Sequence, residues 1–272
     1  KGLPYLVSLR GGDVPGLVPE LTSFHKILKP IRRKVLANAR AIIANSNYLA
    51  EKATIVDGFP VRVVPNGVNV IYFSPRQNSI DGSFRQSIFK LLFVGRLHHQ
   101  KNLPGLLERL AIAKDDYHLD FHLSVVGDGP ERDTAVRVAN KYDLSSRIDW
   151  YGWLEKDSIK DLYQESDCVL NMSTYEGLPN VVLEAMSCGL LVIVSDIPPH
   201  RELVEDGVTG YLVSLSNLTG IAEKMMEIAN DIEKSIRIQG MARQKMGDNY
   251  SWETSAREYI RLLTAVDTKD PQ

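Results

Sequence analysis

Two carboxylates eight residues apart, Glu176 and Glu184, flank a Gly-Leu-Pro-Asn turn. Proline suits the first turn of a helix because its missing N–H would be unsatisfied there, so we expect Pro179 to open a helix through the apolar run 181–186. Glu176 then lies in the loop that faces the helix N-terminus, and Glu184 lies just over one turn into the helix. Free N–H groups and the helix dipole favour an anion at that end. The segment therefore predicts a phosphate site with a carboxylate on either side for sugar hydroxyls.

Two cations follow the predicted strand at 91–95. Arg96 can donate two hydrogen bonds to a phosphate, and Lys101 supplies a mobile point charge. Either could instead be a solvated loop cation, but the spacing G-R-L-x-x-x-K-N after a buried strand favours the phosphate role. The chain has no D-x-D motif and no His or Asp cluster with metal-ligand spacing. We therefore expect that the anion is neutralised without a divalent ion.

Apolar runs of strand length alternate with amphipathic segments through the centre of the chain. The runs lie at 89–94, 121–126, 168–172 and 191–194, and the helix candidates at 103–114, 131–142, 156–165 and 180–187. This alternation predicts a parallel, doubly wound sheet. Ligands of such sheets bind beyond the carboxyl ends of the strands. Arg96, Gly127, Glu176 and Asp196 all follow a predicted strand directly or lie in the loop behind it.

The first 75 residues indicate only half of such a domain. Strands are expected at 4–9, 40–44 and 61–64, with Ser46 capping a helix, and the polar stretch 75–84 has linker composition. Near the other end, Ser251 is a good N-cap for a last helix that reaches about residue 265.

Composition excludes several classes of protein. The 272 residues are 44% hydrophobic, which suits a globular core, and the formal net charge is −2 with no long basic stripe for nucleic acid. No apolar run approaches the roughly 20 residues that span a bilayer, and the N-terminus lacks the pattern of a signal peptide. We therefore expect a soluble, cytoplasmic chain. Cys168 and Cys188 are expected to pack as reduced, buried thiols.

Five ordered stretches resemble one enzyme family. They are the E-x7-E element around Glu176 and Glu184, VPNGVN at 64–69, LLFVGRLHHQKN at 91–102, LSVVGDGPER at 123–132, and DIPPHRELVEDGVTGYLV at 196–213. Together they resemble the retaining glycosyltransferases of the GT-B fold, family 4. A lone E-x7-E occurs by chance in many helices, whereas five matches over residues 60 to 265 are specific.

The resemblance implies a site for a nucleotide-diphosphate sugar, UDP- or GDP-linked, with no metal. Arg96 and Lys101 would hold the diphosphate, Glu184 the ribose hydroxyls, and Glu176 the transferred sugar. The base would lie between the Gly127–Pro130 turn and the backbone after the 148–151 strand, because glycine lets the backbone approach a ligand closely. The expected catalytic residues are Glu176, Arg96 and Lys101, and the expected binding residues are Gly95, Gly127, Gly129, Trp153, Leu154, Gly177, Leu178, Pro179, Asn180 and Glu184.

The resemblance also implies a domain layout and a reaction. Residues 1–75 would be the end of an acceptor-side domain, 76–86 a linker, 87–250 a Rossmann-like donor domain, and 251–272 a helix that returns to the first domain, anchored by Trp252. We expect transfer with retention to a glycan or lipid-linked acceptor, in cell-surface polysaccharide synthesis, with membrane contact through an absent N-terminal region. This chain would then be a donor-binding fragment, inactive alone.

One departure and three alternatives stay open. Arg10 stands where many family members carry a histidine, so either it contacts the donor or this stretch is misaligned, with Asp13 as another polar candidate. The alternatives are a sugar-nucleotide epimerase, a non-catalytic nucleotide-binding module and an α-glucan phosphorylase. A phosphorylase would need a lysine that holds pyridoxal phosphate, and this chain lacks the sequence context for one.

Overall fold

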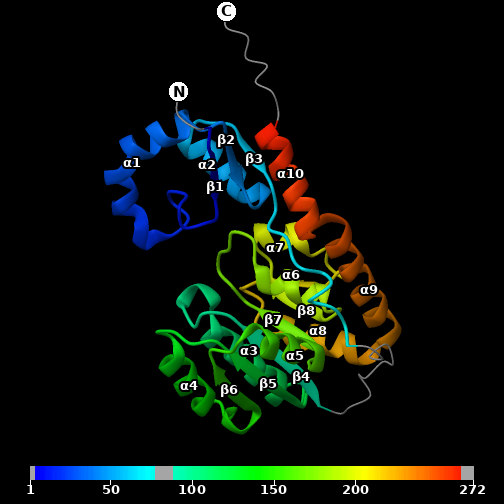
Figure 1. The fold of residues 1–272 in the computed structure, drawn as a ribbon. Coiled ribbons are helices and arrows are strands. Elements are labelled where there is room, and N and C mark those ends of the chain that lie inside the picture. Colours follow the sequence, from blue (N-terminus) through cyan, green and yellow to red (C-terminus); the bar gives the residue numbers. More distant parts are fainter. Residues whose placement is uncertain (1–3, 77–87, 265–272) are drawn as a thin grey trace, which may run out of the picture. The chain divides into compact units, whose positions relative to one another are not determined.

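A computed structural model describes residues 4–76 and 88–264, which form two compact units. The small unit comprises the residues up to Gly67 together with those from Asn249, and the large unit runs from Val68 to Asp248 (Figure 1). Except for Arg76, the expected linker at 76–86 lies outside the described residues.

Three parallel strands form the sheet of the small unit, in the order β1-β2-β3. Their bounds are Leu6–Leu9, Ala41–Ala44 and Val61–Val63. The predicted strands were thus right in place and one or two residues too long. A core of small and branched apolar side chains packs on this sheet, comprising Leu9, Val14, Leu36, Ile42, Ala44, Leu49, Ala50 and Ala53.

Three α-helices and a short 3-10 turn, η1 (Pro19–Leu21), accompany the small sheet: α1 (Thr22–Ala37), α2 (Asn47–Asp57) and α10 (Trp252–Thr264). Ser46 caps α2 as predicted, accepting from the Leu49 N–H at 3.2 Å. The prediction missed α1, because its basic residues and Pro30 obscure the helical pattern.

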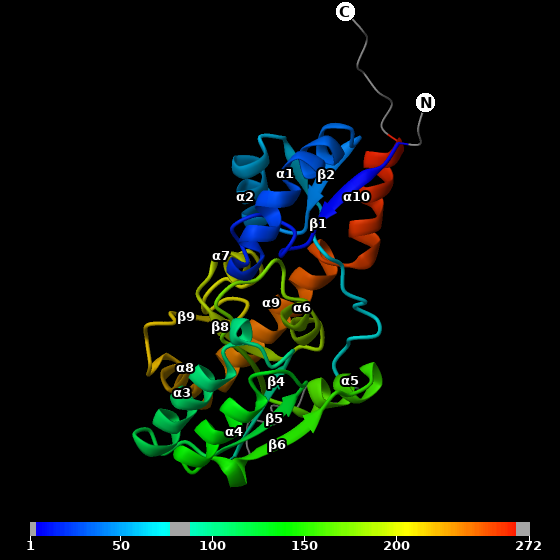
Figure 2. The same cartoon turned by 90° about the vertical axis from the view of Figure 1, so that its left-hand side faces the viewer.

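Helix α10 packs beside the small sheet (Figure 2). Ser255 Oγ donates to the Pro65 carbonyl at 2.8 Å, and Leu262 is buried with Ile43 and Val64. A Cβ on Gly67 would lie 2.5 Å from Cα of Trp252, so only glycine lets the chain pass there. The Trp252 side chain, expected to be the anchor, is 51% exposed, so Ser255 and Leu262 make the buried contacts.

The large unit contains a six-stranded, wholly parallel sheet in the order β6-β5-β4-β7-β8-β9. The strand bounds are Phe89–Val94 (β4), Phe121–Val126 (β5), Ile148–Gly152 (β6), Cys168–Asn171 (β7), Leu191–Ser195 (β8) and Tyr211–Val213 (β9). After β4 the chain builds β5 and β6 on one side, and it then returns to place β7 on the other side. The strand order therefore reverses between β4 and β7, which is the switch point where doubly wound sheets bind ligands.

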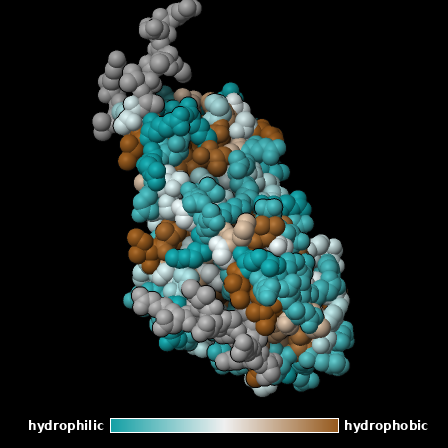
Figure 3. Space-filling model, turned by 90° about the vertical axis from the view of Figure 1, so that its right-hand side faces the viewer, coloured by the Kyte–Doolittle hydropathy of each residue, from teal (hydrophilic) through white to brown (hydrophobic). Residues whose placement is uncertain are grey.

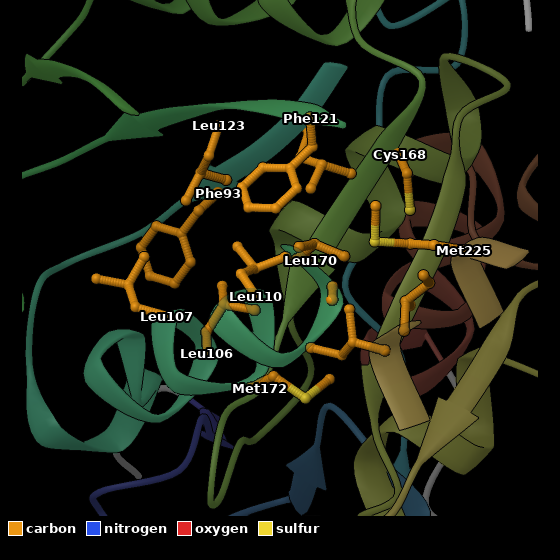
Figure 4. Packing of buried hydrophobic residues seen from close by; sticks show 14 of the residues in the cluster. Phe93, Leu106, Leu107, Leu110, Phe121, Leu123, Cys168, Leu170, Met172 and Met225 are labelled. Atoms are coloured by element: carbon orange, nitrogen blue, oxygen red, sulfur yellow. The ribbon is translucent and has the colours of Figure 1, made fainter. Parts of the chain in front are cut away.

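Helices lie between successive strands of this sheet and, as α8 and α9, after its last strand. They are α3 (Leu103–Asp115), α4 (Arg132–Lys141), α5 (Lys156–Glu165), α6 (Asn180–Ser187), α7 (Pro198–Leu203), α8 (Gly220–Asn230) and α9 (Ile232–Asn249), with short 3-10 turns η3 (His99–Lys101) and η4 (Ser145–Arg147). The main core lies between the sheet and helices α3 and α8, with Phe93 of β4 and Phe121 of β5 among its largest side chains (Figure 4). The predicted α/β class with a doubly wound parallel sheet is confirmed.

Candidate functional site

The loops after β4 and β7 meet at the switch point of the large sheet. The Thr174 N–H donates to the Gln100 carbonyl at 2.8 Å, and Gln100 Nε2 donates to the Tyr175 carbonyl at the same distance. These bonds tie the two loops together. Two residues distant in sequence, Lys101 and Glu176, are thereby brought into contact.

Lys101 and Glu176 form a largely buried ion pair, with Nζ 2.5 Å from Oε1 and side chains 16% and 8% exposed. Ser173 Oγ donates to the same carboxylate at 2.7 Å, and Gln100 Nε2 lies 3.3 Å from Oε2. The expectation of a mobile Lys101 is therefore wrong, because Glu176 holds it. Among the described residues, Oε2 accepts only the long Gln100 bond, so it retains capacity for a hydroxyl donor.

A hydrogen-bonded chain supports this pair from beneath. Ser195, at the end of β8, donates to the Ser173 carbonyl at 2.5 Å, and Nδ1 of His200 lies 2.7 Å from the Ser195 carbonyl. Burial lowers the pKa of His200 to about 4, so the ring is neutral, and its Nε2 has no partner among the described residues. Sequence reasoning missed His200, although a serine and a histidine close behind a buried strand were a usable signal.

Glu184 is half-buried on α6 and accepts a hydrogen bond from Tyr163 at 3.1 Å. Burial raises the pKa of the Glu184 carboxyl and, with Glu184 nearby, that of the fully buried Tyr163. Glu184 is therefore not a fully solvated surface residue. Tyr163 was not foreseen, since nothing in the sequence pairs α5 with α6.

A hollow of about 610 Å³ opens beside the loop after β4, lined by Arg96, Asp128, Gly129 and Trp153. The Arg96 side chain is exposed and forms no hydrogen bond or ion pair with the described residues. Trp153 is 70% exposed and Leu154 half-buried. An unpaired guanidinium and an accessible indole in one hollow can bind an anion and an aromatic ring. Asp128 was quoted in the motif but not chosen as a site residue.

The glycines of this region serve close contact between two loops. A Cβ on Gly127 would lie 2.0 Å from the Gly95 carbonyl oxygen, and one on Gly129 would lie 2.4 Å from that of Leu97. The predicted reason for Gly127 and Gly129 was approach to a ligand. The packing against the loop after β4 requires them whether or not a ligand binds.

The turn before α6 differs slightly from its prediction. Pro179 is the N-cap of α6 and not its first residue, and the side chains of Leu178 and Pro179 are buried. Leu178 and Gly177 have backbone N–H groups that donate to no described residue, while Asn180 begins the helix with an exposed side chain. The turn can therefore bind an anion through its backbone.

Three other candidates have partners of their own. Within the small unit, Arg10 donates to Asn66 and, at 3.1 Å, to Ser8, while the carboxylate of Asp13 accepts from the backbone N–H of Arg10 at 2.9 Å. In the large unit, Arg201 holds Asp196 at 2.5 Å and lowers the pKa of that carboxyl. These contacts account for the side chains structurally.

Both cysteines are buried and free, as predicted, and burial raises the pKa of Cys188 to about 12. Within residues 4–76 and 88–264, no group of three or more His, Cys, Asp or Glu side chains could hold a metal ion. No helix of that same part of the chain is long and apolar enough to cross a bilayer.

Comparisons with known proteins place this site in a family context. The chain is 27% identical to an uncharacterized glycosyltransferase of Methanocaldococcus jannaschii over 96% of this chain and 69% of that protein. It is 26% identical to a GDP-mannose:cellobiosyl-diphosphopolyprenol alpha-mannosyltransferase of Xanthomonas oryzae pv. oryzae over 95% of this chain and 67% of that protein. Anabaena HepE, solved in complex with UDP and glucose, has a similar fold, with a TM-score of 0.80 and 23% identity over 97% of this chain and 72% of HepE.

The chain spans between 45% and 69% of the length of curated relatives that it matches. Its structural neighbours confirm the predicted GT-B type of fold. The family profile described as "Glycosyl transferases group 1" matches residues 78–245, which is more than half of the chain. The chain therefore belongs to the glycosyl transferases of group 1.

Proposed function

We propose that this chain carries the donor site of a retaining, family 4 glycosyltransferase that takes a sugar from a nucleoside diphosphate. The observation that carries the proposal is the Lys101–Glu176 pair at the switch point between β4 and β7, the expected position for a ligand of a doubly wound sheet. The hollow with Arg96 and Trp153 opens next to the same β4 loop.

Each donor group has a matching partner in this arrangement. Arg96 and the N–H groups of Gly177 and Leu178 bind the diphosphate, and Lys101 adds charge while it positions Glu176. The Oε2 atom of Glu176 accepts a hydroxyl of the transferred sugar. These contacts matter most as the bond between sugar and phosphate breaks, because the leaving diphosphate gains negative charge.

The ribose and base bind further along the carboxyl edge. Glu184, oriented by Tyr163, accepts the ribose hydroxyls, and the base lies in the hollow near Gly129 and against the exposed Trp153. HepE was solved with UDP and the Xanthomonas relative is named for GDP-mannose, so both bases stay candidates.

Transfer proceeds on the front face of the sugar. The bond from the anomeric carbon to the phosphate oxygen breaks, the acceptor hydroxyl oxygen forms the new bond, and its proton moves to the leaving phosphate oxygen. A double displacement needs a second carboxylate close to the first on the other side of the sugar. Glu184, oriented by Tyr163, is assigned to the ribose and not to the sugar that is transferred, which favours the front-face route.

The acceptor is proposed to be a glycan or a lipid-linked sugar, in cell-surface polysaccharide synthesis. Two relatives support this, since their names specify diphosphopolyprenol or diphosphoundecaprenol acceptors. The proposed place of action is the cytoplasmic side of a membrane. A sugar-nucleotide epimerase is the alternative, and a labelled donor with product analysis separates transfer from epimerisation.

Nucleotide titration tests the donor site directly. In calorimetry, UDP or GDP should bind the 272-residue chain, and Arg96→Ala should weaken binding by about 1.5–3 kcal/mol. Binding should persist in EDTA, because cations of the chain neutralise the diphosphate. Equal affinity of wild type and Arg96→Ala for the nucleoside diphosphate would show that Arg96 does not bind the phosphates.

We further propose that binding and transfer separate in this chain. Donor contacts lie between Gly95 and Glu184, whereas transfer needs a closed site that orients an acceptor hydroxyl. Relatives are longer than this chain, so the comparison is with a version extended upstream, given the same sugar nucleotide and extracted acceptors. Efficient transfer by the 272 residues alone would contradict this part of the proposal.

A further inference from the structure

His200, on α7 of the large unit, is a fully buried histidine behind the candidate site. The side of the protein seen in Figure 3 carries many hydrophilic residues, whose polar atoms water can satisfy. His200 is 0% exposed, so its two ring nitrogens need partners within the protein. Nδ1 lies 2.7 Å from the carbonyl oxygen of Ser195, whereas Nε2 has no partner among the described residues.

The contact with Ser195 decides which ring nitrogen carries the proton. A carbonyl oxygen only accepts hydrogen bonds, so Nδ1 of His200 is the protonated nitrogen. Burial keeps the ring neutral, because it lowers the pKa of His200 to about 4. Nε2 therefore has a buried lone pair without a donor, a cost that a leucine in the same place would avoid. The hydrogen bond from Nδ1 is what the histidine adds at this position.

Ser195 passes the constraint from His200 to the loop after β7. Its Oγ lies 3.1 Å from Nδ1 and donates its own proton to the Ser173 carbonyl at 2.5 Å, so it can only accept from the ring. The same peptide unit contains the Thr174 N–H, which donates to the Gln100 carbonyl at 2.8 Å. Because a peptide unit is planar, bonds at both its oxygen and its nitrogen fix its orientation.

Ser173 connects that peptide unit to the carboxylate of Glu176. Its Oγ donates to Oε1 of Glu176 at 2.7 Å, and the same oxygen pairs with Lys101. Ser173, Ser195 and His200 are each 0% exposed, so water does not compete for the bonds between them. With Oε1 taken by Ser173 and Lys101, Oε2 is the oxygen left for a sugar hydroxyl.

We propose that His200 is a positioning residue for the transferred sugar, acting through Ser195 and Ser173 on the orientation of Glu176. This role rests on the proposed function, in which Glu176 is the sugar contact. His200 is given no contact with the diphosphate, the ribose or the base, because other residues bind those groups. Loss of the Nδ1 donor should therefore weaken binding of the sugar and leave binding of the nucleotide.

Paired calorimetric titrations of the 272-residue chain test this role. The dissociation constant of a sugar nucleotide divided by that of its nucleotide isolates the sugar, with UDP-glucose, UDP-galactose and GDP-mannose as probes. Glu176→Ala is the reference variant, and the probe used is one for which it raises this ratio. His200→Leu should then raise the ratio about fivefold, as expected for one lost hydrogen bond, and leave nucleotide affinity within about twofold.

Two variants separate the hydrogen bond from the bulk of the ring. His200→Asn should keep the ratio near that of wild type, because its amide N–H can replace Nδ1 as a donor to Ser195. Ser195→Ala should raise the ratio as His200→Leu does. A matched control is His122, which is 40% exposed and pairs with Asp149, so His122→Leu should leave the ratio unchanged. Melting temperatures show whether each variant folds.

NMR of the imidazole nitrogens gives a second measurement that needs no leucine variant. At neutral pH the wild-type ring of His200 should carry its proton on Nδ1 and none on Nε2. The signal is assigned by its absence from the spectrum of His200→Asn. A proton on Nε2 in place of Nδ1 would overturn the inference, because the ring could not donate to Ser195.

The titrations distinguish failure of this inference from failure of the proposed function. No binding of any nucleotide, or a ratio that Glu176→Ala leaves unchanged for every probe, would overturn the donor site and the role of His200 with it. A ratio that Glu176→Ala raises and His200→Leu does not would overturn the role of His200 alone. Equal weakening of nucleotide and sugar nucleotide in His200→Leu would also overturn it, since that result indicates a general structural effect.

Discussion

Replacing Lys101 by methionine should reveal how strongly the switch point depends on its ion pair. The lysine and its partner Glu176 are only 16% and 8% exposed, so Lys101→Met leaves a buried carboxylate without its counter-charge. Such a loss typically costs 3 to 5 kcal/mol. Glu176 keeps its bond from Ser173 at 2.7 Å and a longer one from Gln100, so we expect the lower limit, about 3 kcal/mol in the free energy of unfolding.

A double-mutant cycle isolates the pair. Glu176→Gln should cost about 1.5 kcal/mol, because an amide keeps part of the hydrogen bonding and Lys101 can reach water. The double variant should lose about 2 kcal/mol, which is about 2.5 kcal/mol less than the two single losses together. Urea unfolding followed by circular dichroism measures all four proteins.

Arg96 is the matched control cation, since it is exposed and lies at the other end of the same loop. Arg96→Met should change stability by no more than about 0.5 kcal/mol. Both Arg96→Met and Lys101→Met should weaken nucleoside-diphosphate binding by about 1.5–3 kcal/mol in calorimetry. Additive losses in the cycle, or equal destabilisation by both lysine and arginine variants, would refute the reasoning about the buried pair.

Three further predictions concern the surroundings of this pair. Burial raises the pKa of Glu184, so as the pH is lowered nucleotide affinity should begin to fall at a pH above the usual titration range of a glutamate. Calorimetry at several pH values measures this fall, which the Glu184→Gln variant should not show. His200 is buried with a pKa of about 4 against 6.5 when unfolded, so the unfolded chain binds a proton first as the pH falls. The free energy of unfolding should therefore decrease by about 3 kcal/mol between pH 6.5 and pH 4 on account of this residue. A His200→Gln variant that shows the same decrease in urea unfolding would argue against this. In Gly127→Ala the new Cβ would lie 2.0 Å from the Gly95 carbonyl oxygen, so the variant should lose about 3 kcal/mol of unfolding free energy. Gly240→Ala on α9, where nothing lies within 4 Å of a Cβ, should gain about 0.5–1 kcal/mol. Similar melting temperatures for the two variants would contradict the close packing at Gly127.

Much of the large unit could be predicted from sequence because β7 and β8 are wholly buried and β4 and β5 are largely so. Such strands appear as continuous apolar runs, so β4 and β5 were placed without error and β7 and β8 to within one residue. The short strand β9 and the helices α7, α8 and α9 were not predicted. Helix α1 was missed for a different reason, since its charged residues are all basic and Pro30 interrupts the helical pattern.

The order of the strands could not be obtained from the sequence. Alternation predicts a parallel sheet, but the pairing of β4 with β7 depends on side-chain packing across the whole sheet. That pairing creates the switch point. Without it, Lys101 and Glu176 are two separate motif residues with no reason to touch.

The sequence by itself determined the family, the α/β class and the residues that carry charge or lack a Cβ at the carboxyl edge of the sheet, because these depend on local pattern and composition. Only the tertiary structure decided what each of them contacts. It buried Glu176 against Lys101, joined Glu184 to Tyr163, placed His200 beneath the site and required Gly127 for packing against Gly95. The physical reason is that burial and hydrogen-bond partners come from segments far apart in the chain, and local sequence carries no record of which segments will meet.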